Sequence, residues 1–164
     1  MKKKTITLIL CGIIFVTGVA FFSINYIIPI MIFSTISQSH IDGNVPSKED
    51  IDMFLQRDLT KYFSSDDENI NVKYKLLRDK PTQVGIAFPK YYAWIEVYSG
   101  DNLIKEGAIK VSAIDKKEFK VNEFLSKQTI IENEEILTTI FPSDVCKKIK
   151  LYVNNSEGMK INGF

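Results

Sequence analysis

The chain has 164 residues, of which 45% are hydrophobic, and its 21 basic and 20 acidic side chains give a formal net charge of +1. Such a near-neutral balance lacks the basic excess of nucleic-acid-binding proteins, so we expect no nucleic acid partner. A single histidine and two cysteines argue against a histidine-based metal centre and against a serine or cysteine triad. We therefore expect no catalytic residues, no metal and no cofactor.

A long charge-free run opens the chain. No acidic or basic side chain occurs between Lys4 and Asp42, and three lysines stand directly before this gap. As a helix, Ile6 to Ile28 would reach roughly 34 Å at about 1.5 Å of rise per residue, enough to cross the hydrocarbon core of a bilayer. The sequence predicts a basic tip over residues 1–5 and a transmembrane helix over residues 6–28, with the lipid bilayer as partner.

The distribution of charge around this run indicates its orientation. Lys2, Lys3 and Lys4 precede it, whereas Asp42 is the first charged residue after it. Because positive charge stays on the cytoplasmic side, we predict a single-pass protein of the cell membrane with its N-terminus in the cytoplasm. The rest of the chain would lie outside, in the periplasm or the extracellular space.

Two alternatives concern this region. A signal peptide cleaved after Ala20 would make the protein secreted, but cleavage there would leave Phe21 to Phe33 as an apolar new terminus. Pro29 removes a backbone donor and disfavours helical geometry at the residue before it, so the helix is either kinked there or followed by an apolar segment at the bilayer surface. We expect residues 29–46 to form an apolar stem and a polar linker.

The exported domain, residues 47–164, begins with a predicted amphipathic helix. Ser47 offers a cap, and Asp50 follows it three residues later. Apolar residues then recur at helical spacing, namely Ile51, Phe54, Leu55, Leu59, Tyr62 and Phe63. We expect this helix to bury one face, and the acidic run at residues 66–68 to lie in a solvated loop.

Alternating patterns after residue 69 predict a sheet. We expect strands over residues 70–76, 83–88, 91–99, 103–114 and 119–124. The third and fourth of these form the clearest hairpin, with Gly100 and Asp101 as its loop. That loop would place Glu96 opposite Lys105 and Trp94 opposite Gly107.

Capping signals predict one or two short helices at the end of the chain. Asn133 precedes an apolar stretch that Pro142 ends, and Ser143 opens a further turn through Ile149. The expected fold is therefore α+β, with a transmembrane helix, an amphipathic helix packed on a four- or five-stranded antiparallel meander, and the short C-terminal helices. This order resembles the layout of the cystatin-like and NTF2-like folds, and the likeness is one of layout alone.

The cysteines and two lysine clusters are further candidates for chemistry. Cys11 lies within the apolar run, so Cys146 cannot pair with it and is either a free thiol or bonded to another chain. Two lysine clusters, around Lys116 and around Lys148, would touch anionic lipid if both faced the membrane, and otherwise are solvated faces.

The candidate ligand-binding residues lie on one predicted strand. By strand alternation Tyr92, Trp94, Glu96 and Tyr98 share one face. A carboxylate among three aromatic rings suits a ligand groove on a curved sheet, and the alternative is a central strand buried under a helix.

No motif names a reaction, so the expected function follows from the anchor and the size of the domain. We expect a binding or assembly module whose partner is a protein of the envelope or the cell surface. The alternatives are an immunity-type or inhibitory protein against an exported toxin or hydrolase, and the secreted form considered above.

Overall fold

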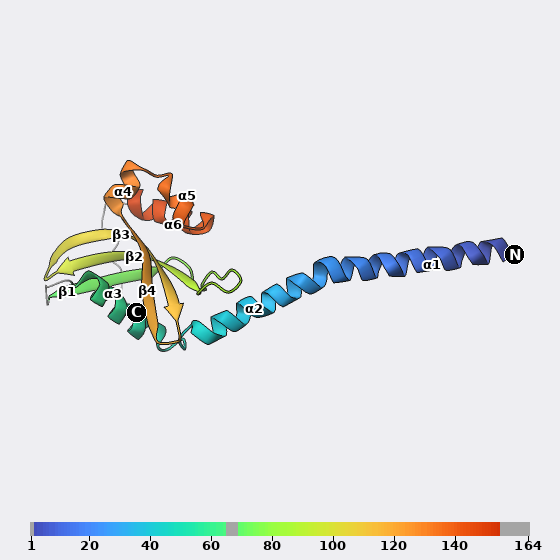
Figure 1. Cartoon of the computed structure of the whole chain (residues 1–164). Coiled ribbons are helices and arrows are strands. Elements are labelled where there is room, and N and C mark those ends of the chain that lie inside the picture. The colour runs from blue at the N-terminus through green and yellow to red at the C-terminus, as the bar shows by residue number, and fades with distance from the viewer. Residues whose placement is uncertain (1, 65–68, 155–164) are drawn as a thin grey trace. The chain divides into compact units, whose positions relative to one another are not determined.

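The computed structural model of the chain describes residues 2–64 and 69–154, with side chains from residue 12 onward. It divides into two units, Met1–Ser39 and His40–Phe164. The predicted acidic loop at residues 66–68 lies outside the described residues. The architecture is α+β: a long apolar helical segment, one antiparallel sheet and several further helices (Figure 1).

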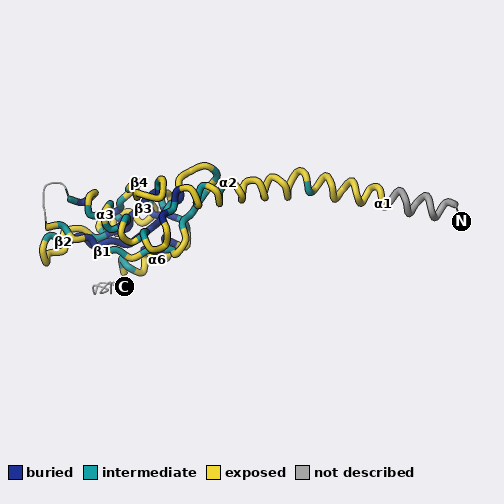
Figure 2. Tube along the Cα trace, turned by 90° about the horizontal axis from the view of Figure 1, so that it is seen from below, coloured by how far each residue is buried: buried dark blue, intermediate teal, exposed yellow. Residues whose placement is uncertain are grey.

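The N-terminal segment is helical as far as Asn44. It consists of α1 (Lys2–Phe22), a π-helical turn η1 (Ser23–Ile27) and α2 (Ile28–Asn44). The helix over Gly12–Asn44 contains an 18-residue stretch with a mean hydropathy of 2.1 and is long enough to cross a membrane, as an anchor or a signal sequence near the N-terminus would be. Nearly all residues from 12 to 39 are exposed (Figure 2).

The π-helical turn explains how the helix passes Pro29. The Ile28 N–H donates to the Ser23 carbonyl, a bond five residues long that widens the turn directly before the proline. A proline ring in a regular α-helix collides with the carbonyl four residues earlier, and the widened turn relieves this clash. The helix therefore continues past Pro29, and the segment expected as a polar linker is helical as far as Asn44.

Asn44 fixes the end of α2 to the turn between the last two strands. Its carbonyl accepts from the Lys116 N–H at 2.9 Å, and its side-chain Oδ1 accepts from the Asp115 N–H at 3.1 Å. Asp115 and Lys116 have φ of 50° and 59°, as the central residues of a type I′ turn require. The chain therefore enters the domain at the β3–β4 end of the sheet.

The amphipathic helix forms as predicted, as α3 (Ile51–Phe63). The Asp50 N–H donates to Ser47 Oγ at 3.3 Å, so Ser47 caps the turn that leads into the helix. Leu55, Leu59 and Phe63 are buried, which is the face that the spacing of apolar residues indicates.

Within the described residues four strands make the sheet, in the order β1-β2-β3-β4 and antiparallel throughout. They are β1 (Ile70–Leu76), β2 (Lys90–Ser99), β3 (Asn102–Ile114) and β4 (Glu118–Ser126). The strand predicted over residues 83–88 is wrong. That segment is a loop, in which the Ala87 N–H donates to the Val84 carbonyl and the Gln83 side chain donates to the carbonyls of Gly85 and Ala87.

The β2–β3 hairpin has the predicted loop but a different register. A bulge between Val97 and Tyr98 shifts the pairing by one residue, so Val97 and not Glu96 lies opposite Lys105. Ile95 lies opposite Gly107 for the same reason. The predicted pairs of Glu96 with Lys105 and of Trp94 with Gly107 are therefore wrong, because one extra residue on a strand shifts every later pairing.

Helices cover both faces of the sheet (Figure 1). On one face α3 packs on a core that includes Ile95, Val97 and Ile109. On the other face lie α4 (Lys127–Glu132), α5 (Ile136–Ile140) and α6 (Ser143–Asn154). Helix α4 is additional to the predicted helices, and it is capped by Ser126, whose Oγ accepts from the Thr129 N–H at 3.1 Å.

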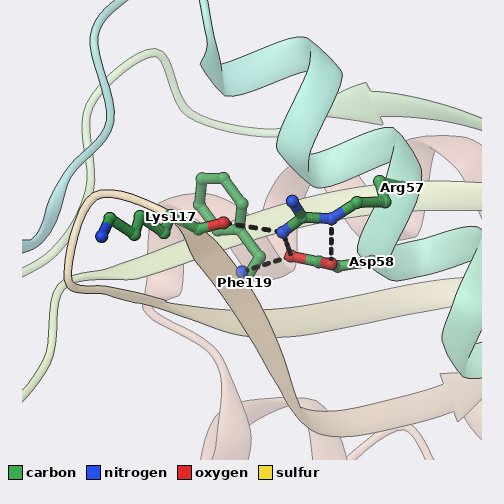
Figure 3. A network of polar contacts seen from close by, with 4 residues as sticks. All are labelled: Arg57, Asp58, Lys117 and Phe119. Atoms are coloured by element: carbon green, nitrogen blue, oxygen red, sulfur yellow. Dashed lines mark hydrogen bonds and ion pairs between the residues drawn. The ribbon is translucent and has the colours of Figure 1, made fainter.

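Side chains of α3 satisfy backbone groups on both edge strands. The Gln56 side chain donates to the Val72 carbonyl on β1 at 2.7 Å. Asp58 Oδ2 accepts from the Phe119 N–H on β4 at 2.7 Å, and Arg57 pairs with Asp58 and donates to the Lys117 carbonyl (Figure 3). Groups that would otherwise recruit another strand are thus occupied from within the domain.

Candidate functional site

The four predicted site residues do share one face of β2, but they fall into two environments. Tyr92 and Trp94 are buried beneath the C-terminal helices. The Trp94 ring stacks on Tyr152 of α6, with centroids 5.2 Å apart, and the Tyr92 ring meets Phe141 edge-on at 5.9 Å. These two rings therefore pack the core and do not line an open groove.

Glu96 and Tyr98 lie farther along β2, toward the hairpin. The Tyr98 hydroxyl donates to Glu96 Oε2 at 2.7 Å, and Lys73 Nζ lies 4.7 Å from the centroid of the Tyr98 ring. The hydrogen bond to Glu96, with burial as a lesser cause, raises the pKa of Tyr98 to about 12. A phenol with this pKa stays protonated near neutral pH, so it positions Glu96 and does not act as a base.

A second carboxylate stands beside Glu96. Glu106 on β3 is its direct partner in the register, and Lys73 on β1 is its partner on the other side. Two like charges opposite one another destabilise a sheet unless they are compensated. Lys127 of α4 supplies the compensation, because its Nζ forms an ion pair with Glu106 Oε2 at 2.9 Å.

These five residues form what we call the polar cluster: Lys73, Glu96, Tyr98, Glu106 and Lys127. Three strands and one helix contribute to it, and Glu96 at its centre is only 9% exposed. Its two lysines equal its two carboxylates in number, and one lysine and one carboxylate form an ion pair, an arrangement that suits recognition of another polar surface more than proton transfer. Among the residues that the structure describes, no group of three or more His, Cys, Asp or Glu side chains is placed to hold a metal ion.

Sequence reasoning found Glu96 and Tyr98 but missed the rest of the cluster. Glu106 was hidden by the bulge, because the unshifted register places Lys105 opposite Glu96. Lys105 instead turns to the other face, where its Nζ lies 5.6 Å from the centroid of the Phe63 ring. Lys127 belongs to the helix that was not predicted, although Ser126 before it is the residue that signals a helix cap.

Cys146 lies apart from this cluster, on α6. It is a free cysteine and is buried, and its Sγ lies 3.4 Å from the carbonyl oxygens of Leu137 and Phe141. Burial raises the pKa of the thiol. Both features are typical of a cysteine that packs a core and reacts slowly.

Two groups of exposed apolar side chains lie at the ends of the sheet, and sequence reasoning missed both groups. At the hairpin end Leu103 and Ile104 are 49% and 48% exposed. At the other end, in the loop between β1 and β2, Val84, Ile86 and Phe88 are 72%, 79% and 44% exposed. Residues in this loop alternate as they would in a strand, so the sequence predicted a strand there and not an exposed apolar loop.

A pocket of ≈ 200 Å³ opens between α4 and α6, away from the polar cluster. Ile130, Ile131 and Val153 line it, together with the ion pair of Glu134 and Lys150. The pocket is small and open, and it presents neither an orphaned polar group nor a nucleophile. It therefore adds no chemistry to that of the polar cluster.

Comparison of this chain with protein-family models, with curated proteins and with solved structures gives no match. Support for a function therefore comes from the geometry of the polar cluster and of the exposed apolar groups.

Proposed function

We propose that this protein is a single-pass membrane protein whose extracytoplasmic domain binds another exported protein through its β2–β3 hairpin end. The observation that carries the proposal is an apolar pair beside the polar cluster. Leu103 lies directly opposite Tyr98 in the register, and residues so paired share a face of the sheet. An apolar centre flanked by matched charges is the usual composition of a protein-binding surface.

The bulge in the hairpin supports this assignment. It inserts Ile104 as an unpaired residue of β3 between the positions opposite Tyr98 and Val97. Bulges re-aim side chains at the ends of sheets and often accompany binding sites. Burying Leu103 and Ile104 completely against a partner would contribute about 0.75–1.5 kcal/mol for each side chain, half the value for a fully exposed one, because each is already about half buried.

The membrane anchor supports the rest of the proposal. The helix over Gly12–Asn44 is apolar and long enough to span a bilayer, and the lysines before it favour a cytoplasmic N-terminus. Cleavage after Ala20 would leave Phe21 and the apolar residues after it on the mature chain. These observations favour a retained anchor over a cleaved signal peptide.

We further propose that the domain has the cystatin-like layout, in which one helix lies across a curved antiparallel meander. Its support is that α3 bonds to both edge strands through Gln56 and Asp58. The likeness concerns arrangement and implies no shared activity.

Photo-crosslinking of the full-length protein in its own membranes tests the binding surface. A photoreactive side chain at Ile104 is expected to give one discrete adduct with an exported protein, and Leu103→Asp in the same chain is expected to abolish it. The matched control places the same group at Glu132, on the exposed side of α4. Equal adducts from both positions, or an adduct that survives Leu103→Asp, would contradict the proposed surface.

A topology reporter fused after Phe164 tests the anchor and its orientation. We expect activity from a reporter that works outside the cytoplasm and none from one that works inside it. Cytoplasmic activity would overturn the proposal as a whole.

A further inference from the structure

We infer that the loop between β1 and β2, residues 83–89, is a second membrane contact that inserts its apolar side chains into the lipid surface next to the anchor. Val84, Ile86 and Phe88, the apolar group described above, all belong to this loop. Exposed apolar side chains that gather in one short loop mark a candidate interaction site. The inference rests on the proposed membrane anchorage and is independent of the hairpin surface.

The loop is built to present these side chains. A turn is closed by the Ala87 N–H and the Val84 carbonyl at 3.2 Å, and Gly85 at φ 56° supplies the left-handed conformation. Gln83 Nε2 donates to the Gly85 carbonyl at 2.9 Å and also to that of Ala87. These bonds satisfy carbonyl groups of the loop from within the loop itself. Its apolar side chains are left exposed on the outside.

The position of the loop in the domain identifies the lipid surface as its partner. Pro89 at its end is buried, and the Pro89 carbonyl accepts from the Ala113 N–H at 2.9 Å, near the end of β3. Two residues farther on, Asp115 and Lys116 bond to Asn44, where the chain enters from the apolar helix. The loop and the point at Asn44 where the chain enters the domain therefore lie at the same end of the sheet, opposite to Leu103 and Ile104.

The length of the apolar helix favours a domain held close to the bilayer. As a helix, residues 6–36 would reach roughly 46 Å, well beyond the hydrocarbon thickness of about 30 Å, and a helix with this excess tilts. Only residues 37–44 follow before the domain, at most roughly 12 Å of helix. A tilted anchor with so short an extension keeps this end of the domain within reach of the headgroups.

Charges around the loop suit a headgroup layer. Lys116 and Lys117 are exposed on the β3–β4 turn, with Asp115 and Glu118 beside them, and Lys80 is exposed before the loop. The lysines can reach lipid phosphates while the loop enters the layer below them. With the acidic residues so close, apolar insertion and not net charge would dominate the contact.

Tryptophan scanning of the full-length protein in phosphatidylcholine vesicles tests this inference. Three variants, Val19→Trp, Ile86→Trp and Leu103→Trp, place a probe in the anchor, in the loop and at the opposite end of the sheet. All three positions are exposed within the protein, so the substitutions should fold, and the native Trp94 is buried and common to all. Quenching is measured with two sets of lipids, one with bromine near the headgroup end of the acyl chains and one with bromine near the bilayer centre, because Val19 lies near the middle of the span.

We expect a blue-shifted emission and quenching by brominated lipid at positions 19 and 86, and neither at position 103. Adding Ile86→Asp and Phe88→Asp to a Val84→Trp variant is expected to abolish the quenching of the probe at position 84. Quenching at position 19 without quenching at position 86 would overturn the inference and leave the anchor intact. Equal quenching at positions 86 and 103 would also overturn it, and no quenching at position 19 would overturn the anchorage on which it rests.

Discussion

Gly107 shows how closely β3 and β4 approach one another. A Cβ atom at this position would lie 2.1 Å from the Leu125 carbonyl oxygen and 2.9 Å from a ring carbon of Phe124. We expect Gly107→Ala to force the two strands apart and to lower the free energy of unfolding by about 1–3 kcal/mol. Urea denaturation of the detergent-solubilised protein, followed by the fluorescence of Trp94, measures the effect.

Gly43 in α2 provides the matched control for this substitution. A Cβ added there meets nothing within 4 Å, so Gly43→Ala should be neutral or stabilise the helix by up to about 1 kcal/mol. Equal losses of stability from the two variants would show that the contact with β4 is not the cause.

Tyr98 makes stability depend on pH at the alkaline end. Its pKa is raised to about 12 in the folded protein, above the ordinary value of roughly 10, so folding favours the protonated phenol. The stabilisation is therefore complete below about pH 10 and is lost as the pH rises through about 12. We expect Tyr98→Phe to cost about 0.5–1 kcal/mol at pH 8, because the pair is partly exposed and solvent screens it.

The difference between the wild type and Tyr98→Phe should shrink as the pH approaches 12, and urea denaturation at a series of pH values checks this. Tyr62→Phe, at an exposed position on α3, is the control and should leave the pH profile unchanged. A difference that stays constant up to pH 12 would contradict the assigned role of the bond to Glu96.

At the scale of elements, the contact between α3 and β4 depends on Asp58 more than on Arg57. Asp58 accepts from the N–H of the buried Phe119, whereas the Arg57 side chain is 51% exposed. We expect Asp58→Ala to leave that N–H unsatisfied and to cost about 1–3 kcal/mol, and Arg57→Ala to cost less than about 1 kcal/mol. Hydrogen exchange of the Phe119 amide should accelerate strongly in the first variant alone.

Local patterns predicted the elements better than their pairing. The sequence predicted helix α3, strand β1 and the loop at Gly100 and Asp101 correctly. Each depends on the spacing of apolar residues or on turn residues only a few positions apart. Residues 83–88 alternate as they would in a strand, but their backbone groups bond to one another and to the side chain of Gln83. The bulge that brings Glu106 beside Glu96 depends on how β3 fits both neighbours, which no local pattern contains.

The candidate site shows the same division. Alternation on β2 correctly placed Trp94 and Glu96 on one face, because side-chain direction in a strand is a local property. Whether that face is open or covered depends on where α5 and α6 pack, which is a property of the tertiary fold. Trp94 is therefore a core residue that packs against Tyr152, while Glu96 lies at the edge of the area that the C-terminal helices cover.

At the scale of the whole molecule, the stability of the domain is expected to be independent of the anchor. Both hydrophobic cores draw their buried residues from the unit His40–Phe164. A fragment that begins at His40 should therefore unfold cooperatively, with a midpoint in urea close to that of the full-length protein. Near-ultraviolet circular dichroism checks its tertiary packing, and a fragment without such a signal would contradict this expectation.

Helix α3 bonds to both edge strands of the sheet, so the two edges depend on the same helix for their protection. If α3 detaches, Val72 on β1 and Phe119 on β4 lose their partners in the same event. A chain in that state can join copies of itself on either side and grow as a stack of strands. Conditions that loosen this one helix should therefore convert the protein directly into fibrils, without a long-lived dimer in between.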